Sequence, residues 1–166
     1  MNNKIKIEFM SISENESFAR SVISCFALKL NPSISQIADV KTAVSEAVTN
    51  AIVHGYQGRN GEDKILIECI GETSDGYGGV LHIKITDYGC GIEDVERALV
   101  PFYTTLADEE RSGMGFTIMQ TFTDDFSVKS EKGVGTVVEL SKKVGAESLC
   151  ADGLEAANQE KERLNA

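Results

Sequence analysis

Glu46 and Asn50 could act together in one site, because they lie four residues apart in a predicted helix. The stretch from Asp39 to Gly55 repeats apolar residues at three- and four-residue steps, which predicts an amphipathic helix. Glu46, Asn50 and His54 then share one edge of that helix. An acid and a carboxamide one turn apart can direct a carboxylate and an oxygen ligand into one cleft. The same edge is also compatible with plain solvation, so its function depends on the rest of the chain.

Asp87, Gly89 and Gly91 follow a predicted strand and form the motif DxGxG. Glycines there let the main chain approach a flat ligand, since no Cβ intervenes. Asp87, at the tip of the strand, offers an acceptor to an exocyclic amine. Taken singly, the motif is equally compatible with a structural turn.

A second glycine motif, Gly113-Met114-Gly115, directly precedes a predicted helix. Glycines at a helix start expose N–H groups, and the helix dipole adds positive charge there, so the position favours phosphate. Arg111 beside it could bind phosphate oxygens through its forked guanidinium. The spacing matches neither a P-loop nor a dinucleotide fingerprint, so this motif alone is weak.

The elements that must position these residues follow the order strand, two helices, two strands, short helices, two strands. This order predicts an α+β fold, a two-layer α/β sandwich with a mixed, mostly antiparallel sheet and helices on one face. The last four strands should form two hairpins. The predicted strands are Lys4–Met10, Lys64–Gly71, Val80–Asp87, Phe126–Ser130 and Gly135–Ser141, and the later helices are Glu93–Leu99 and Gly113–Phe122.

Composition predicts one globular domain at residues 1–143, followed by an acidic tail at 144–166 that is mobile or a frayed helix. The net charge of −10 argues against direct binding to nucleic acid. The sequence has neither an apolar run of the ~20 residues that span a bilayer nor a signal-peptide core. We therefore expect a cytoplasmic protein that has no membrane association and whose four scattered cysteines are reduced.

Four motifs in a fixed order resemble one superfamily. They are EAVTN on the helix, DxGxG after a strand, GxG before a helix, and Gly135-Thr136 at the last strand. From Lys4 to Lys143 the chain resembles the GHKL, or Bergerat-fold, ATPases. The segments EAVTNAIVHGY, DYGCGI, PFYTT and RSGMGFTIM are most similar to the serine-kinase anti-sigma factors, and among these to the sporulation anti-sigma F factors.

This resemblance implies a Mg²⁺-ATP or ADP site. Asn50 corresponds to the ligand of Mg²⁺, Glu46 to the general base, and Arg111 to the arginine that neutralises charge on the γ-phosphate. Asp87 corresponds to the residue that binds adenine, and Thr136 to a threonine that supports it through water. Gly89 and Gly91 would carry the main chain past the base. The ATP lid and the phosphate cradle are expected at Thr104, Thr105, Ser112, Gly113, Met114, Gly115 and Phe116.

The resemblance also implies partners. A homodimer with bound ATP or ADP would inhibit a sporulation sigma factor of the sigma F type, and would phosphorylate a serine on a STAS-type anti-anti-sigma protein. Arg20 corresponds to an arginine that contacts the sigma factor, although a solvated helix arginine is equally compatible with its position. Two alternatives stay open: a kinase of the general stress response, or a nucleotide-gated binding module without phosphotransfer. Glu46 favours a kinase, because holding ATP requires no base.

Overall fold

The computed structural model describes residues 2–57, 63–73, 78–102 and 113–145. These residues form five strands, with helices after the first strand and between the third and the fourth. The elements are β1 (Asn2–Met10), α1 (Glu14–Ala27), η1 (Leu28–Leu30), α2 (Ile34–Asn50), η2 (Ala51–Gly55), β2 (Lys64–Thr73), β3 (Gly79–Asp87), α3 (Val95–Ala98), α4 (Gly115–Phe122), β4 (Asp125–Glu131) and β5 (Gly135–Val144).

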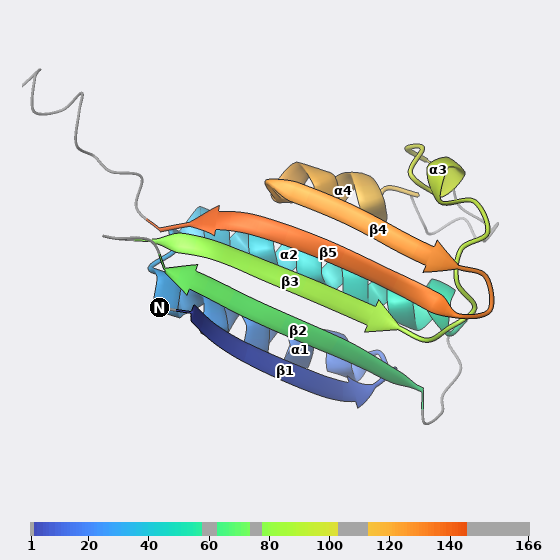
Figure 1. Ribbon diagram of the computed structural model, residues 1–166, viewed down its shortest axis with the longest axis horizontal. Coiled ribbons are helices and arrows are strands. Elements are labelled where there is room, and N and C mark those ends of the chain that lie inside the picture. The colour runs from blue at the N-terminus through green and yellow to red at the C-terminus, as the bar shows by residue number, and fades with distance from the viewer. Residues whose placement is uncertain (1, 58–62, 74–77, 103–112, 146–166) are drawn as a thin grey trace, which may run out of the picture.

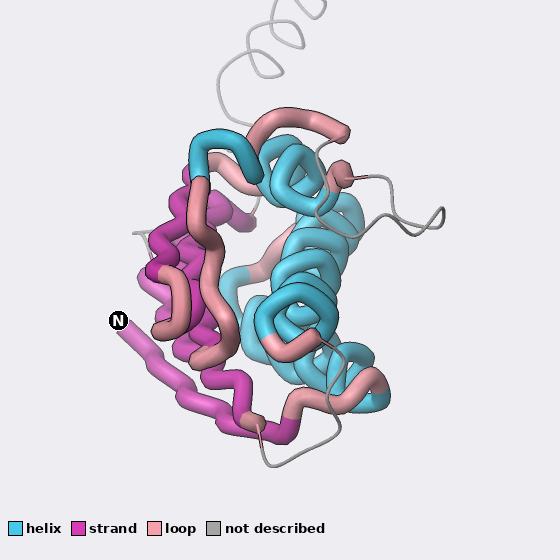
Figure 2. The backbone as a smooth tube through the Cα atoms, turned by 90° about the vertical axis from the view of Figure 1, so that its right-hand side faces the viewer, coloured by secondary structure: helices cyan, strands magenta, loops and turns pink. Residues whose placement is uncertain are grey.

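The strands form one sheet in the order β1-β2-β3-β5-β4, and α1, α2 and α4 lie on one of its faces (Figures 1 and 2). The predicted α+β sandwich is therefore confirmed, as are its two hairpins. One detail differs, because every pairing among the described strands is antiparallel where a partly parallel sheet was expected. The reason is the place of β5. It lies between β3 and β4, whose directions agree, so these two strands never pair.

The core lies between the sheet and α2. Alternate residues of β2 and β3 are buried against it, including Ile65, Ile67, Ile83 and Ile85. The apolar stripe of α2 packs on them because its small and branched residues recur at helical spacing. These residues are Val40, Ala43, Val44, Ala47 and Val48. With one side of α2 fixed in this way, Glu46 and Asn50 stay half-buried at its edge.

Helix α2 begins at a capping box, in which Ser33 and Gln36 bond each other's main-chain N–H groups. It ends differently from the prediction. The expected single helix to Gly55 is α-helical only as far as Asn50, and η2 is a π-helical turn. The Tyr56 N–H bonds the Ala51 carbonyl oxygen at 2.9 Å, five residues back. This wider turn brings Gly55 and Tyr56 against the segment that follows β3, which spacing alone does not reveal.

Strand β5 ends at Val144. The acidic tail lies outside the described residues beyond position 145, so it stays a prediction. Among the described helices, none combines the length and the hydropathy needed to cross a bilayer.

Candidate functional site

Glu46 and Asn50 meet the first residue of α4. A Cβ atom at position 115 would lie 3.1 Å from Asn50 Nδ2, 3.2 Å from Asn50 Oδ1 and 3.2 Å from Glu46 Oε2. Gly115 thus leaves room between the start of α4 and both polar side chains. Exposed N–H groups at a helix start attract anions, and the start of this helix adjoins a carboxylate and an amide. We name Glu46, Asn50 and Gly115 the helix junction.

Two contacts hold α4 in this place. Met119 is fully buried beneath the helix. The ring of Phe116 lies 5.9 Å from that of Phe126 on β4, centroid to centroid, in a tilted arrangement. Two residues of the predicted phosphate cradle are placed by this helix. Met114 is its N-cap, and Phe116 packs from its first turn.

The electrostatics of the helix junction involve α1. Burial raises the pKa of Glu46, and the nearby carboxylate of Glu16 raises it further. Glu16 Oε1 lies 3.5 Å from Arg20 Nε on the next turn of α1. Glu46 therefore keeps its proton to a higher pH than an exposed glutamate, which makes it a stronger base when ionised.

Asp87 ends β3 in a buried position, with 6% of its surface exposed. Its Oδ1 accepts a hydrogen bond from the Gly89 N–H at 3.0 Å, and its partner in the ladder is Thr136 of β5. Burial raises the pKa of Asp87, while hydrogen bonds from the Gly89 and Thr136 main chain act in the opposite direction. Gly55 adjoins the carboxylate, because a Cβ there would lie 2.9 Å from Oδ1. We name Gly55, Asp87, Gly89, Gly91 and Thr136 the Asp87 corner.

The glycines of the Asp87 corner are required by the protein's own main chain. A Cβ at Gly89 would overlap the Gly55 carbonyl, and one at Gly91 would overlap the Glu131 carbonyl. Gly91 also has a φ of +66°, which disfavours other residues. These packing reasons are sufficient for both glycines. Their predicted approach to a nucleotide base stays a prediction.

The sequence analysis missed two residues of this region. The Tyr56 hydroxyl accepts a hydrogen bond from the Tyr88 N–H, next to Asp87. Ser130 Oγ accepts a hydrogen bond from the Ile92 N–H and lies 2.9 Å from Thr136 Oγ1. An available signal for Tyr56 was an aromatic residue opening an otherwise polar loop; Ser130 had none beyond its place on the core side of β4.

Comparison with known proteins identifies the family. The model of the histidine kinase-like ATPase domain matches residues 13–142. Proteins named anti-sigma F factor are 50% identical over 145 residues in Thermoanaerobacter sp. strain X514 and 52% identical over 141 residues in Clostridium beijerinckii. These alignments cover 87% and 85% of this chain, and 96% and 94% of the relatives. The chain belongs to the anti-sigma F factors of the histidine kinase-like ATPase family.

Solved structures agree on the fold. The RsbU and RsbW domains of a Mycobacterium tuberculosis protein have a TM-score of 0.57 at 16% identity, over 86% of this chain and 32% of that one. The mycobacterial sensor histidine kinase MprB has a TM-score of 0.50 at 15% identity, over 87% of this chain and 98% of that one. At these identities the likeness concerns the fold alone.

Four residues predicted for this ATPase-family site, Thr104, Thr105, Arg111 and Ser112, lie outside the described residues. The residues that flank them are joined. The Phe102 N–H bonds the Gly113 carbonyl oxygen at 3.1 Å, and Gly113 has a φ of +63°. Phe102 and Gly113 therefore lie side by side, two residues before α4 begins at Gly115.

The residues of the helix junction fit the nucleotide chemistry of an ATPase domain, because an amide and a carboxylate lie against the start of a helix. Asn50 offers a hard, neutral oxygen, which fits a Mg²⁺ ion that takes its other ligands from phosphates and water. Among the described residues, no group of three His, Cys, Asp or Glu side chains could hold a metal without such help.

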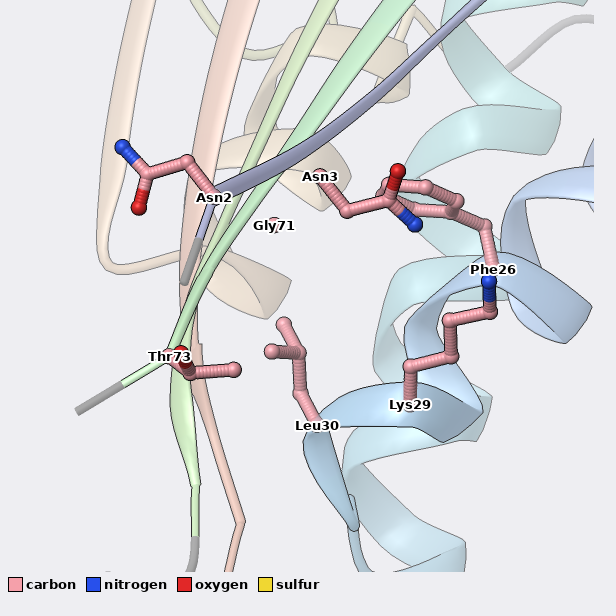
Figure 3. A pocket seen from close by; sticks show the side chains of 7 residues that line it. All are labelled: Asn2, Asn3, Phe26, Lys29, Leu30, Gly71 and Thr73. Carbon is pink, nitrogen blue, oxygen red and sulfur yellow. The ribbon is translucent and has the colours of Figure 1, made fainter. Parts of the chain in front are cut away.

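A cavity of about 390 Å³ lies elsewhere in this ATPase-family fold, between η1 and the ends of β1 and β2 (Figure 3). Phe26 and Leu30 border it opposite Gly71. Gly71 lies six residues along β2 from Ile65, the partner of Asp87, which is about 20 Å. No candidate site residue lines this cavity, so it is separate from the helix junction and the Asp87 corner.

Proposed function

We propose that this protein is an anti-sigma factor that is also a serine kinase. The anti-sigma role rests on relatives named anti-sigma F factor, which are about 50% identical to this chain. The kinase activity rests on the helix junction, where a half-buried carboxylate lies beside an amide and the start of a helix. Simple nucleotide holding needs the amide and the helix start. Only group transfer needs the carboxylate.

In this mechanism the N–H groups at the start of α4 bind the phosphates of ATP, and Asp87 accepts a hydrogen bond from the adenine amine. The serine hydroxyl of the antagonist attacks the γ-phosphorus, the bond between that phosphorus and the β–γ bridging oxygen breaks, and ADP leaves. Glu46 accepts the serine proton. Mg²⁺ held by Asn50 would neutralise phosphate charge during this transfer. Arg111 would add positive charge at the same end.

The proposed partners are a sigma factor of the sigma F type and a STAS-type anti-anti-sigma protein, both met by a homodimer in the cytoplasm. Arg20 is the proposed sigma contact. Its side chain is 45% exposed on α1 and is paired with Glu16. An acidic residue of a partner could therefore reach it. Phosphorylation would add negative charge to the antagonist, and this chain of net charge −10 would repel it.

The test uses γ-labelled ATP, Mg²⁺ and a candidate STAS protein with the purified protein and two variants. Glu46→Gln should slow label transfer by roughly 10²–10⁴-fold while ADP affinity stays close to wild type. Glu8→Gln is the matched control, because Glu8 is exposed and pairs with Lys64 on the outer face of the sheet. Transfer that survives Glu46→Gln at full rate contradicts the base assignment.

The same experiment separates the alternatives. Sigma binding that depends on nucleotide, with no label on any STAS protein, supports a gated binding module. Transfer to a stress-response STAS protein in preference to a sporulation one, with matching sigma binding, supports the stress assignment. Both sigma classes therefore belong in the assay.

A further inference from the structure

Tyr56 lies where three segments of the fold meet. It directly follows η2, and its side chain is only 2% exposed. The hydroxyl reaches the start of β2 on one side and the turn after β3 on the other. A buried tyrosine hydroxyl needs hydrogen-bond partners, and here it bonds two main-chain groups.

The hydroxyl has two distinct roles. It donates to the Lys64 carbonyl oxygen, and it accepts from the Tyr88 N–H at 2.8 Å. Burial is the main cause that raises the pKa of Tyr56, so the phenol keeps the proton that it donates. Tyr88 is the residue after Asp87, so this bond fixes the main chain directly beside the buried carboxylate.

Two further bonds connect the same segments. The Cys90 N–H bonds the Gly55 carbonyl oxygen at 2.8 Å, and Cys90 Sγ bonds the His54 carbonyl oxygen at 3.1 Å. Gly55 in turn faces the carboxylate of Asp87. Three consecutive residues, 54, 55 and 56, thus bond Tyr88 and Cys90 in the turn after β3.

We infer that Tyr56 is a positioning residue for the nucleotide site. Its hydroxyl fixes the position of Asp87 relative to Asn50 and Glu46. This inference rests on the proposed function in one respect, that the nucleotide carries adenine. Asn50 precedes Gly55 by five residues, across the π-helical turn η2. A ligand that contacts both Asn50 and Asp87 therefore depends on the attachment between η2 and the turn after β3.

The test compares ATP with inosine triphosphate, which has a carbonyl in place of the adenine amine. Calorimetry with Mg²⁺ gives both dissociation constants for the wild type, Tyr56→Phe and Tyr88→Phe. Tyr56→Phe keeps the ring and loses the hydroxyl. Tyr88→Phe makes the same chemical change at a side chain that is 62% exposed, and leaves the Tyr88 N–H in place.

Tyr56→Phe should weaken ATP binding roughly three- to tenfold, the effect of about one hydrogen bond, with inosine triphosphate affected much less. The preference for ATP then falls, and the Tyr88 amide proton exchanges faster. In the kinase assay KM for ATP should rise while kcat stays within about twofold, because the helix junction is intact. A purely structural role would lower both affinities in proportion and leave their ratio unchanged.

An unchanged ratio in folded Tyr56→Phe overturns the inference. If that variant does not fold, Cys90→Ala removes the thiol bond to His54 from the same attachment and must lower the same ratio; an unchanged ratio there also overturns it. Failure of the wild type to bind any adenine nucleotide rejects the proposed function instead, so the two failures are distinguishable.

Discussion

The Asp87 corner and the helix junction both contain glycines that allow close approach. At the corner main chain approaches the glycine, and at the junction side chains do. At the corner, Gly89 and Gly91 make room for carbonyl groups of the protein's own main chain. At the junction, Gly115 makes room between the start of α4 and two side chains, Glu46 and Asn50. Every corner residue except Gly91 is buried, whereas both side chains of the junction are half-exposed.

This difference separates stability from function. A change at the corner forces main chain apart, and main chain cannot turn away as a side chain can. A change at the junction meets the ends of two side chains, which can move. We therefore expect substitutions at corner glycines to unfold the protein, and the equivalent substitution at the junction to leave a folded protein with an impaired site.

Gly89→Ala should have the largest effect. The new Cβ would overlap the Gly55 carbonyl oxygen, which also accepts the Cys90 N–H bond. We expect the free energy of unfolding to fall by more than ~3 kcal/mol, measured by urea denaturation.

Gly133→Ala is its control. Gly133 has a positive φ, +81°, which Gly89 does not share, and a Cβ at Gly133 would meet nothing within 4 Å. That variant should lose only about 1–2 kcal/mol from backbone strain. Equal losses in the two variants would show that the Gly55 contact is unimportant.

Asp87→Asn should have the next largest effect. It should lower the affinity for ATP, but it should raise stability relative to the wild type as pH rises. ATP affinity should fall at least about tenfold, or 1.4 kcal/mol, because an amide is a weaker acceptor than a carboxylate. Folding raises the pKa of Asp87, so its contribution to stability is complete below the unfolded pKa and is lost as pH rises through the folded pKa.

Asp87→Asn lacks this loss. Unfolding measured from pH 4 to pH 8 should therefore show the wild type losing stability relative to the variant as pH rises. If the stability of the wild type and of Asp87→Asn changes with pH in parallel, the Asp87 carboxyl has the same pKa in the folded and unfolded states. Asp125→Asn makes the same chemical change at an exposed acid at the start of β4, away from the corner, and is the control.

Sequence patterns predicted those features that depend on near neighbours. The apolar period of α2 and the alternation of β2 and β3 specify which faces are buried, so the layers and hairpins were predictable. The four-residue spacing put Glu46 and Asn50 together. The meeting of Gly55 with Gly89, and of Gly91 with Glu131, joins residues more than thirty positions apart, and no local pattern encodes it. The bond between the Tyr56 hydroxyl and the Tyr88 N–H also joins residues distant in the sequence, and was missed for the same reason.

Gly115→Ala should have a smaller effect, on ATP affinity rather than on stability. Alanine is the better helix former, so the free energy of unfolding should stay within ~1 kcal/mol of wild type. Its Cβ would crowd the amide of Asn50 and the carboxylate of Glu46, and ATP affinity should fall on the order of fivefold, about 1 kcal/mol. Gln120→Ala, exposed on the same helix, should change neither. Marked unfolding of Gly115→Ala would erase the contrast with Gly89.

Glu16→Gln should have the smallest effect and concerns charge alone. Burial is the larger cause of the raised pKa of Glu46, and the Glu16 carboxylate is the lesser one. Removing that negative charge should lower the pKa of Glu46 without returning it to the value of an exposed glutamate. NMR titration of labelled glutamates in nucleotide-free, metal-free protein measures the change directly. Glu14→Gln, at the exposed start of α1, makes the same charge change and should leave Glu46 unaltered.

Arg20 sharpens this last experiment, because it pairs with Glu16 and partly neutralises it. Arg20→Gln should therefore move the pKa of Glu46 upward, opposite to Glu16→Gln, since Glu16 then acts on Glu46 without compensation. The pKa of Asp87 should respond to neither variant, because its shift arises from burial and its own main-chain hydrogen bonds. If both pKa values move together, the helix junction and the Asp87 corner form one electrostatic site. If only that of Glu46 moves, charge on α1 acts on the proposed base alone.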